Sequence, residues 1–382
     1  MTSPMQYRRF GKTNLQLSVF SLGTMRCLAT EEVAYQTVQR AIALGINHLE
    51  TARGYGQSER YLGQALQSGL SVVREQLYIT TKLSPTPDPD PIERAIDESL
   101  ERLGIDYLDG LAIHGLNTET HLAWVEASNG CMQAVQRAVA DGRVRHVGFS
   151  THGSLDVILR AIATDQFEFI NLHYYLFFQR HAPAIDLAHQ KDMGIFIISP
   201  FDKGGLLYTP PQALQDLCAP LSPLAINTRF LLSDPRITTL SIGPANPQEL
   251  DWPLEIADQD GPLSLAEQAI LERLQIQQEK VLDGDRCSQC YACLPCPEQI
   301  NIPEVLRLRN LAIAYDMAQY GQYRYRMFEN AGHWFPGSKA NRCTDCGDCL
   351  PRCPEQLNIP VLLRDTHQRL NGSARRRLWE ET

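Results

Sequence analysis

Eight of the eleven cysteines in the chain fall into two tight runs near its C-terminus. The runs are Cys287, Cys290, Cys293 and Cys296, and then Cys343, Cys346, Cys349 and Cys353. The second run reads C-x2-C-x2-C-x3-C before a proline, the spacing that places thiolates around 4Fe-4S clusters. The two segments that continue from the last cysteine of each run, CPEQINIPEVL and CPEQLNIPVLL, are nearly one sequence. The pattern predicts an internally duplicated module that binds two 4Fe-4S clusters through these eight cysteines.

Zinc is the alternative metal, because cysteine pairs two residues apart also build tetrahedral zinc sites. Zinc sites usually separate two such pairs by a long loop, so three cysteines two apart with a fourth before proline favour iron. In the two-cluster pattern the fourth cysteine serves the other cluster, which would place Cys353 with the first run and Cys296 with the second. Only Leu294 and Pro295 separate the last two cysteines of the first run, so this exchange is a hypothesis.

A second group of reactive residues lies in the first third of the chain: Glu50, Tyr55, Lys82 and His114. A tyrosine hydroxyl is a poor acid near neutral pH, but a neighbouring ammonium stabilises the phenolate and makes the hydroxyl a usable proton donor to a carbonyl oxygen. Glu50 would keep the Lys82 ammonium charged and oriented toward the tyrosine. His114 would orient the carbonyl or move the proton. The four residues suit carbonyl chemistry if the fold brings them together.

Eight short apolar runs rich in β-branched residues would supply the strands that position these groups. They are residues 18–22, 47–51, 78–82, 108–114, 144–150, 167–174, 194–200 and 238–243. Segments of helical period such as 32–44 lie between them. Eight strand-then-helix units predict a closed (β/α)8 barrel, an α/β fold, with chemistry at the carboxyl ends of its strands. An open doubly wound sheet is the competitor, but no G-x-G-x-x-G follows the first run. Residues 7–11 and 15–17 predict a small hairpin ahead of the barrel.

The segment ETARGYGQSERYLGQAL, residues 50–66, resembles the signature D-T-A-x-x-Y-G-x-S-E-x-x-L-G-x-A-L of the aldo-keto reductase family. The resemblance covers residues 5–255 and includes the lysine of TTKL and the histidine of AIHG. It implies reduction of an aldehyde or ketone, with Tyr55 as general acid and Lys82 as the modulator of its pKa. His114 would then orient the carbonyl and Glu50 would pair with the lysine. The family has aspartate at this last place, so the longer glutamate could lower or redirect activity.

The resemblance also implies a nicotinamide cofactor. In the family, a Ser-Asn pair after the fifth strand and a Gln on the sixth hold the carboxamide, and the matching residues here are Ser150, Thr151 and Asn171. All three can form hydrogen bonds, although two differ from the family's usual residue. The alternative is that they are polar residues of the barrel rim.

Two loops are candidates for the phosphates of the cofactor. After the seventh run, SPFDKGGLL places Ser199, Lys203, Gly204 and Gly205 where a backbone loop can approach a pyrophosphate. After the eighth, residues 243–249 include Gly243, Asn246 and Glu249 and predict a loop that enters a helix with Asn246 as N-cap and Pro247 at its first position, an arrangement that favours anions.

The resemblance implies NADPH, with NADH as the alternative. No lysine or arginine lies between residues 243 and 254 to meet a 2'-phosphate. Arg229 and Arg236 are the nearest candidates.

Composition limits the remaining possibilities. A net charge of -9 argues against a nucleic-acid partner. The sequence contains no uninterrupted run of 18 apolar residues that would predict a membrane-spanning helix. The first residues do not have the pattern of a signal peptide. Together with thiolate ligands, which suit a reducing compartment, these features predict a soluble cytoplasmic protein. The scattered Cys27, Cys131 and Cys218 are expected to be ordinary buried thiols.

The predicted organisation has four parts. Residues 1–258 form the barrel, 259–282 a connecting helix, 283–366 a module that resembles an α-helical ferredoxin domain, and 367–382 a tail. Within the module, 303–328 has helical period.

The clusters raise a question of electron number. A nicotinamide gives up two electrons as one hydride, whereas a 4Fe-4S cluster takes one at a time. The clusters could therefore be an electron-exchange port for a partner such as ferredoxin, structural staples, or a redox sensor. Two functions stand: an NADPH-dependent carbonyl reductase acting on a small molecule, and a nicotinamide-binding electron-relay or sensing protein that reduces carbonyls poorly.

Overall fold

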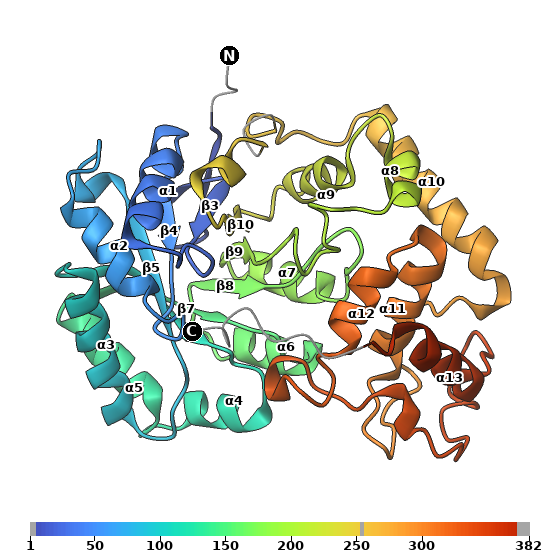
Figure 1. The fold of residues 1–382 in the computed structure, drawn as a ribbon. Coiled ribbons are helices and arrows are strands. Elements are labelled where there is room, and N and C mark those ends of the chain that lie inside the picture. Colours follow the sequence, from blue (N-terminus) through green and yellow to red (C-terminus); the bar gives the residue numbers. More distant parts are fainter. Residues whose placement is uncertain (1–4, 253–255, 373–382) are drawn as a thin grey trace. The chain divides into compact units, whose positions relative to one another are not determined.

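Eight parallel strands close into a barrel in the computed structural model, which describes residues 5–252 and 256–372 (Figure 1). The order around the barrel is β10-β3-β4-β5-β6-β7-β8-β9, so that the first and last barrel strands pair. The strands are β3 (Phe20–Gly23), β4 (His48–Glu50), β5 (Tyr78–Leu83), β6 (Leu108–His114), β7 (Val144–Ser150), β8 (Phe169–Leu172), β9 (Gly194–Ile197) and β10 (Thr239–Ile242). The predicted (β/α)8 barrel is confirmed, and the open sheet is excluded.

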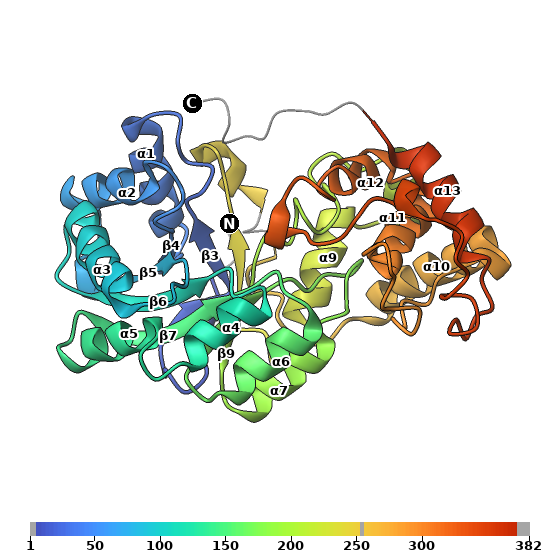
Figure 2. The same ribbon diagram turned by 90° about the horizontal axis from the view of Figure 1, so that it is seen from below.

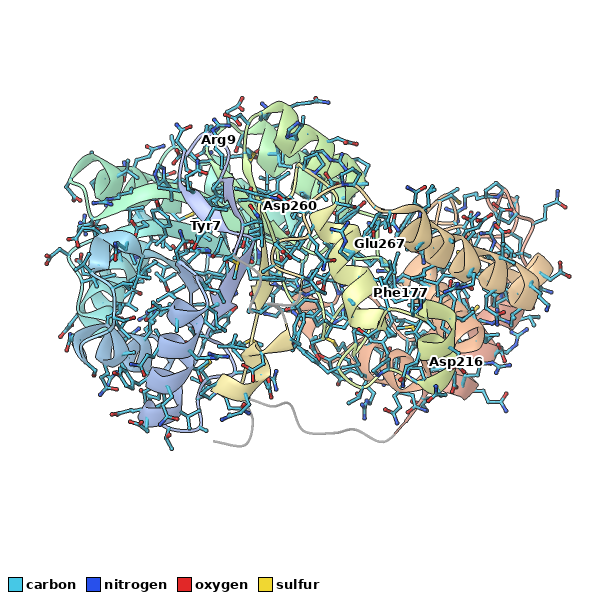
Figure 3. The ribbon with its side chains drawn as sticks, turned by 90° about the horizontal axis from the view of Figure 1, so that it is seen from above. Tyr7, Arg9, Phe177, Asp216, Asp260 and Glu267 are labelled. Carbon is cyan, nitrogen blue, oxygen red and sulfur yellow. The ribbon has the colours of Figure 1, made fainter. Side chains whose placement is uncertain are left out.

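A short antiparallel hairpin precedes the barrel, as predicted. Strand β1 (Tyr7–Arg9) pairs with β2 (Gln16–Ser18). Figure 3 labels Tyr7 and Arg9, whose side chains are exposed, on β1. Beyond β1, Phe10 is buried in a cluster with Leu17, Ala112, Phe169 and Phe196. The amide of Lys12 donates to the carbonyl of Asp192, just ahead of β9, so the hairpin closes the amino-terminal end of the barrel.

Two glycines make room for the aromatic rings at this closed end. A Cβ atom at Gly194 would lie 2.3 Å from the Phe10 ring, and one at Gly148 would lie 2.3 Å from the Phe169 ring. Neither position can carry a side chain without moving a ring that fills the barrel.

Helices lie on the outside of the strands (Figure 2). They are α1 (Glu31–Ala43), α2 (Ser58–Gln67), α3 (Pro89–Leu103), α4 (Glu119–Glu126), α5 (Cys131–Ala140), α6 (Leu155–Ala163), α7 (Ala182–Gln190) and α9 (Pro223–Leu232), with a 3-10 turn η1 (Arg74–Gln76) before β5. Thr30, Thr118 and Ser154 cap α1, α4 and α6 by accepting a backbone N–H three residues on. The helix expected over 32–44 is α1.

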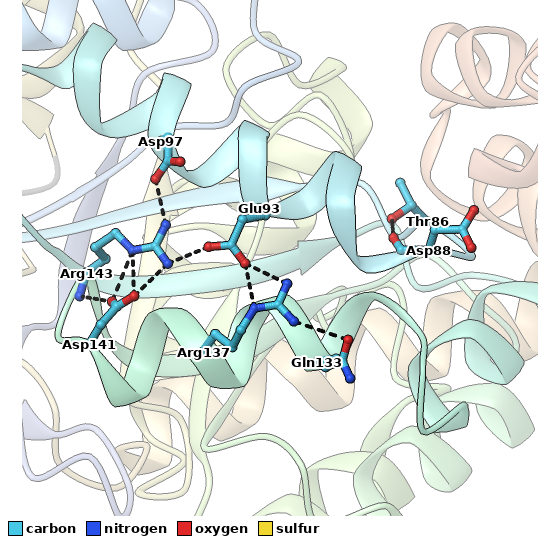
Figure 4. A network of polar contacts seen from close by, with 8 residues as sticks. All are labelled: Thr86, Asp88, Glu93, Asp97, Gln133, Arg137, Asp141 and Arg143. Atoms are coloured by element: carbon cyan, nitrogen blue, oxygen red, sulfur yellow. Dashed lines mark hydrogen bonds and ion pairs between the residues drawn. The ribbon is translucent and has the colours of Figure 1, made fainter.

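An ion-pair network joins two of these helices (Figure 4). The Arg143 guanidinium contacts Glu93 at 2.5 Å and Asp97 at 2.6 Å, both on α3, and Asp141 at 2.6 Å. Arg137 on α5 contacts the other oxygen of Glu93 at 2.8 Å. Although burial opposes it, these two arginines hold the pKa of Glu93 below its usual value.

The chain divides into two compact units. The first consists of residues up to 204 together with 227–262, and the second consists of 205–226 and the chain from 263 onward. The segment 205–226, which contains α8 (Gln212–Cys218), therefore belongs with the second unit, although its position in the sequence suggested the barrel. Within that unit, Arg273 of α10 (Leu265–Leu282) donates to the carbonyl oxygen of Leu217 at 2.9 Å and holds α8 in place.

Helices form most of the second unit. After α10 come η4 (Asp283–Asp285), α11 (Ile302–Tyr315), α12 (Ala318–Tyr325), η5 (Gly332–Trp334), η6 (Ala340–Arg342) and α13 (Ile359–Leu370). The helical period over 303–328 suggested one helix, but Asp316 adopts a left-handed conformation with φ +57 and separates α11 from α12. Helix α13 continues past residue 367, so the predicted tail begins inside it, and 373–382 lie outside the described residues.

Candidate active site

The carboxyl ends of neighbouring strands bring the predicted catalytic residues together. Glu50 ends β4, Lys82 lies near the end of β5, and His114 ends β6. His114 pairs in register with Ser150 of β7, which pairs in turn with Asn171 of β8. Because parallel strands end at one side of a barrel, these residues share one mouth.

Lys82 is at the centre of this group and is 1% exposed. Its ammonium lies 2.8 Å from Oε1 of Glu50, and it donates to the Thr51 carbonyl at 2.9 Å and to the Tyr55 hydroxyl at 3.3 Å. Burial by itself would lower the pKa of Lys82, but the Glu50 carboxylate and Tyr55 raise it above its usual value. Lys82 is therefore a fixed cation with all three donors in use.

Tyr55 follows β4 in a tight turn in which its amide donates to the Ala52 carbonyl at 3.0 Å. Its ring meets the His114 ring edge to face, with centroids 5.6 Å apart. Burial raises the pKa of Tyr55 and outweighs the Lys82 ammonium, which lowers it. The sequence led us to expect a net lowering. The hydroxyl consequently carries its proton near neutral pH and is placed to donate it.

Asn171 is fully buried and contacts the same carboxylate as the lysine. Its Nδ2 donates to Oε1 of Glu50 at 2.8 Å. Its Oδ1 is a buried acceptor that has no hydrogen-bond partner among the residues that the structure describes. The sequence suggested Asn171 as a cofactor residue but contained no sign of its bond to Glu50, 121 residues away.

Ser150 and Thr151 lie beside Asn171 but differ in what their hydroxyls contact. Thr151 is fully buried, donates to the Leu116 carbonyl at 2.7 Å and accepts from the Gly153 amide at 3.0 Å. The Thr151 hydroxyl therefore holds the loops after β6 and β7. Ser150, 2% exposed, stands in register between His114 and Asn171.

The loop after β9 carries the first set of proposed phosphate-binding residues. Ser199 has φ +51, a left-handed conformation, and Lys203 follows in the turn. A Cβ atom at Gly204 would lie 1.8 Å from the Pro200 carbonyl oxygen, so only glycine fits this turn. Gly205 belongs to the second compact unit, where a Cβ atom would lie 2.9 Å from Met317. Gly205 thus has a packing role, and its contact with a phosphate stays a prediction.

The loop after β10 begins at Gly243 and enters a 3-10 turn, η2 (Pro247–Leu250). Asn246 caps it as expected, accepting from the amides of Gln248 and Glu249. The helix expected there is only this four-residue turn, and the Asn246 side chain already occupies its first amides.

Arg26, in the loop after β3, is a cation beside this loop that the sequence did not reveal. It donates to the Gly243 carbonyl at 2.9 Å and pairs with Glu249 at 3.0 Å. The suggested Arg229 and Arg236 are engaged elsewhere. Arg236 precedes β10, at the opposite end of the strand from the mouth, and pairs with Asp234 at 2.5 Å. Arg229 donates to the Gly261 carbonyl at 3.0 Å. Closure of the barrel explains the difference, because it makes β3 and β10 neighbours.

The eight clustered cysteines surround two separate cavities in the second unit. Cys353 joins Cys287, Cys290 and Cys293 around one cavity. Cys296 joins Cys343, Cys346 and Cys349 around the other. Each cavity thus has three cysteines of one run and the fourth of the other, which is the hypothesised exchange.

The spacing of these cysteines bears on the choice of metal. Each cavity has four cysteines around it, which is the number of thiolates that holds a 4Fe-4S cluster. Burial raises the pKa of the Cys293 thiol to about 12, so the metal must displace protons to bind.

The sequence model of the Aldo/keto reductase family matches residues 20–272. The chain belongs to this family. A second model, the 4Fe-4S dicluster domain, matches residues 286–357 and includes all eight clustered cysteines. The protein is therefore an aldo/keto reductase family oxidoreductase with a C-terminal 4Fe-4S dicluster domain.

Several known proteins are similar to this aldo/keto reductase. An aldo/keto reductase of Synechocystis sp. is 30% identical over 248 residues, 59% of this chain and 69% of its own. The glycerol 2-dehydrogenase (NADP(+)) of Saccharomyces cerevisiae is 39% identical over 102 residues, 27% of this chain and 31% of its own. The structure of an aldo-keto reductase from Bacillus halodurans aligns with a TM-score of 0.62 at 21% identity, covering 70% of this chain and 96% of its own, and this likeness shows the fold.

The mouth of this aldo/keto reductase fits a nicotinamide in one specific respect. The buried Oδ1 of Asn171 lacks a donor in the described part of the chain, and a carboxamide NH2 would supply one. Among the helices within the described residues, none is long and apolar enough to cross a membrane.

Proposed function

We propose that the barrel reduces an aldehyde or ketone of a small molecule to an alcohol with NADPH. The observation that carries this proposal is the Tyr55 hydroxyl held 3.3 Å from the charged Lys82 ammonium at the barrel mouth. A proton donor beside a fixed cation is what a carbonyl oxygen needs as it becomes an alkoxide.

Each residue at the barrel mouth has a separate role in the proposed reduction. NADPH, when bound, supplies the hydride that adds to the carbonyl carbon. Asn171 and Ser150 would hold the carboxamide. His114 orients the carbonyl oxygen, and Tyr55 transfers its proton to that oxygen, which completes the alcohol. Lys82 stabilises the tyrosinate that remains until a proton from solvent restores it.

NADPH is preferred to NADH on the family resemblance, and the name of the yeast relative, which includes NADP(+), agrees. Ser199, Lys203, Gly205, Gly243, Asn246 and Glu249 stay proposed contacts of the dinucleotide. Arg26 joins them as the cation next to the loop after β10.

The dicluster domain would hold two 4Fe-4S clusters, one in each four-cysteine cavity. We propose that they exchange electrons with a partner protein such as ferredoxin. The supporting observation is that each set contains one exposed cysteine, Cys290 or Cys346, which would bring both clusters near the surface. Thiolate-bound clusters suit a reducing compartment, so we place the protein in the cytoplasm.

A specific observation keeps the second candidate function, an electron relay or sensor that turns over carbonyls poorly. Glu50 is one methylene longer than the aspartate of the family, and it contacts both Lys82 and Asn171 at 2.8 Å, which departs from the reductase pattern.

The deciding experiment compares the iron-reconstituted protein with Tyr55→Phe under anaerobic conditions. NADPH consumption is followed with a panel of aldehydes and ketones. Loss of the proton donor should lower kcat by about 100-fold or more while NADPH binding is retained. If the wild-type protein binds NADPH but reduces none of the carbonyls, the relay function is preferred.

A further inference from the structure

Glu50 and Asn171 are joined across the barrel by a bond that reaches from one side of the site to the other. Glu50 projects from β4 and Asn171 from β8. A single oxygen, Oε1 of Glu50, accepts from Asn171 Nδ2 at 2.8 Å and contacts Lys82 Nζ at 2.8 Å. Glu50 is 3% exposed and Asn171 is fully buried, so water does not replace either bond.

This bond determines which way the Asn171 amide faces. A carboxylate that stands beside an ammonium can only accept hydrogen bonds, so the NH2 group of the amide must face Glu50. The amide oxygen then points the other way, and it is the buried Oδ1 that lacks a partner within residues 5–252 and 256–372. By fixing the Asn171 amide in this orientation, Glu50 leaves the Asn171 Oδ1 as an acceptor for a ligand that carries an N–H donor.

The combined length of the Glu50 and Asn171 side chains fits the distance between their two strands. The closed barrel sets the separation of β4 and β8, and the 2.8 Å hydrogen bond from Asn171 to Glu50 spans it with a glutamate on one side and an asparagine on the other. Removing one methylene from Glu50 would withdraw the carboxylate by roughly 1.3 Å, which is enough to break a hydrogen bond. Adding one methylene at residue 171 would restore the total length.

We propose that Glu50 and Asn171 are a length-matched positioning pair. Glu50 holds the Lys82 ammonium and, through the same oxygen, orients Asn171 so that Oδ1 receives the carboxamide NH2 of the nicotinamide. Recognition of the carboxamide and placement of the Lys82 ammonium beside Tyr55 therefore both depend on the Glu50 carboxylate. The ligand in this inference rests on the proposed function, whereas the pairing of the two side chains does not.

The test is a double-mutant cycle of Glu50→Asp, Asn171→Gln and the combined variant. The first measurement is the urea midpoint of the cofactor-free protein. Each single variant should unfold at lower urea than the wild type, and the combined variant should return toward the wild-type midpoint. If the two losses simply add, the pair is not length-matched and the proposal is wrong.

The second measurement separates positioning from a merely structural role. Binding of NADPH is compared with binding of its 3-acetylpyridine analogue, which lacks the carboxamide NH2 donor. The wild type should prefer NADPH by about tenfold, because the analogue leaves Oδ1 of Asn171 unpaired. The preference should shrink in each single variant and return in the combined one. An unchanged preference in the single variants would overturn the orienting role.

Glu59→Asp is the matched control. Glu59 is 2% exposed, accepts from Thr81 Oγ1 at 2.7 Å and pairs with Arg102 at 3.0 Å, and neither partner is a predicted catalytic residue. The same one-methylene loss should lower its urea midpoint and leave the preference for NADPH unchanged. If the wild type binds neither dinucleotide, the proposed function fails, and the unfolding cycle still decides the pairing.

Discussion

His48 should make the stability of the barrel depend on pH. It projects from β4, two residues before Glu50, and is 2% exposed. Its Nδ1 lies 2.7 Å from Ser21 Oγ and its Nε2 lies 2.9 Å from Thr80 Oγ1. Burial, together with the nearby Lys82 ammonium, lowers the pKa of His48 to about 3. The folded barrel therefore keeps this imidazole neutral.

The sign and size of the effect follow from proton linkage. An unfolded histidine binds a proton below about pH 6.5, whereas His48 in the folded barrel does not until about pH 3. The unfolded state thus binds more protons in this window, so stability falls as the pH decreases from about 6.5. The slope is at most ~1.4 kcal/mol per pH unit, or about 2 kcal/mol between pH 6.5 and 5.

The assay compares the wild type with His48→Gln by urea unfolding, followed by far-UV circular dichroism. Glutamine keeps a donor and an acceptor between the two hydroxyls but does not titrate. On going from about pH 6.5 to about pH 5, the wild type should lose about 2 kcal/mol more than the variant. Exposed His189 on α7 provides the control, because His189→Gln should behave as the wild type does. Equal losses in the wild type and His48→Gln would refute the reasoning.

Two further predictions concern the clusters and the barrel surface. Cys296→Ser should remove iron mainly from the set that contains Cys343, and Cys353→Ser mainly from the set that contains Cys287. Iron analysis and EPR of the reduced protein would check this, and the reverse pattern would contradict the exchanged arrangement. Arg143→Gln should destabilise the barrel by about 1 kcal/mol, because its side chain is only 24% exposed and joins three carboxylates. Arg160→Gln, which removes a 47% exposed partner of Glu119, should change the urea midpoint little, and equal effects would show that the network adds nothing.

Strand positions could be predicted where a change of residue type coincides with a strand end. Strands β6 and β7 were predicted residue for residue, since an apolar run begins and ends with them. The prediction of 167–174 for β8 was two residues too long at each end, because apolar residues such as Phe167 and Tyr174 continue beyond the strand. Periodicity also shows that a segment is helical without showing what it packs against. The segment that contains α8 was therefore assigned to the barrel, although it belongs with the second unit.

Residue types at the site could be predicted, but the bonds between distant residues could not. Glu50 and Asn171 each looked like an isolated departure from the family pattern, one side chain a methylene longer and the other a methylene shorter. Only the closed barrel shows that they meet, at 2.8 Å. Arg26 was missed for the same reason, since nothing local links the loop after β3 to Gly243, 217 residues away.

The arrangement of the duplicated module is the reason for our proposal that the clusters exchange electrons rather than only stabilise the fold. Because each cavity takes its fourth cysteine from the other run, neither repeat can enclose a cluster alone. Clusters held by both repeats would stabilise the fold, but a cluster with only a structural role does not need to lie near the surface. Cys290 and Cys346 are nevertheless exposed, one in each set. Two clusters that each take one electron could together hold the two electrons of a hydride. A nicotinamide, however, releases both electrons in one step. The clusters would therefore suit a partner that exchanges one electron at a time better than the nicotinamide of the barrel.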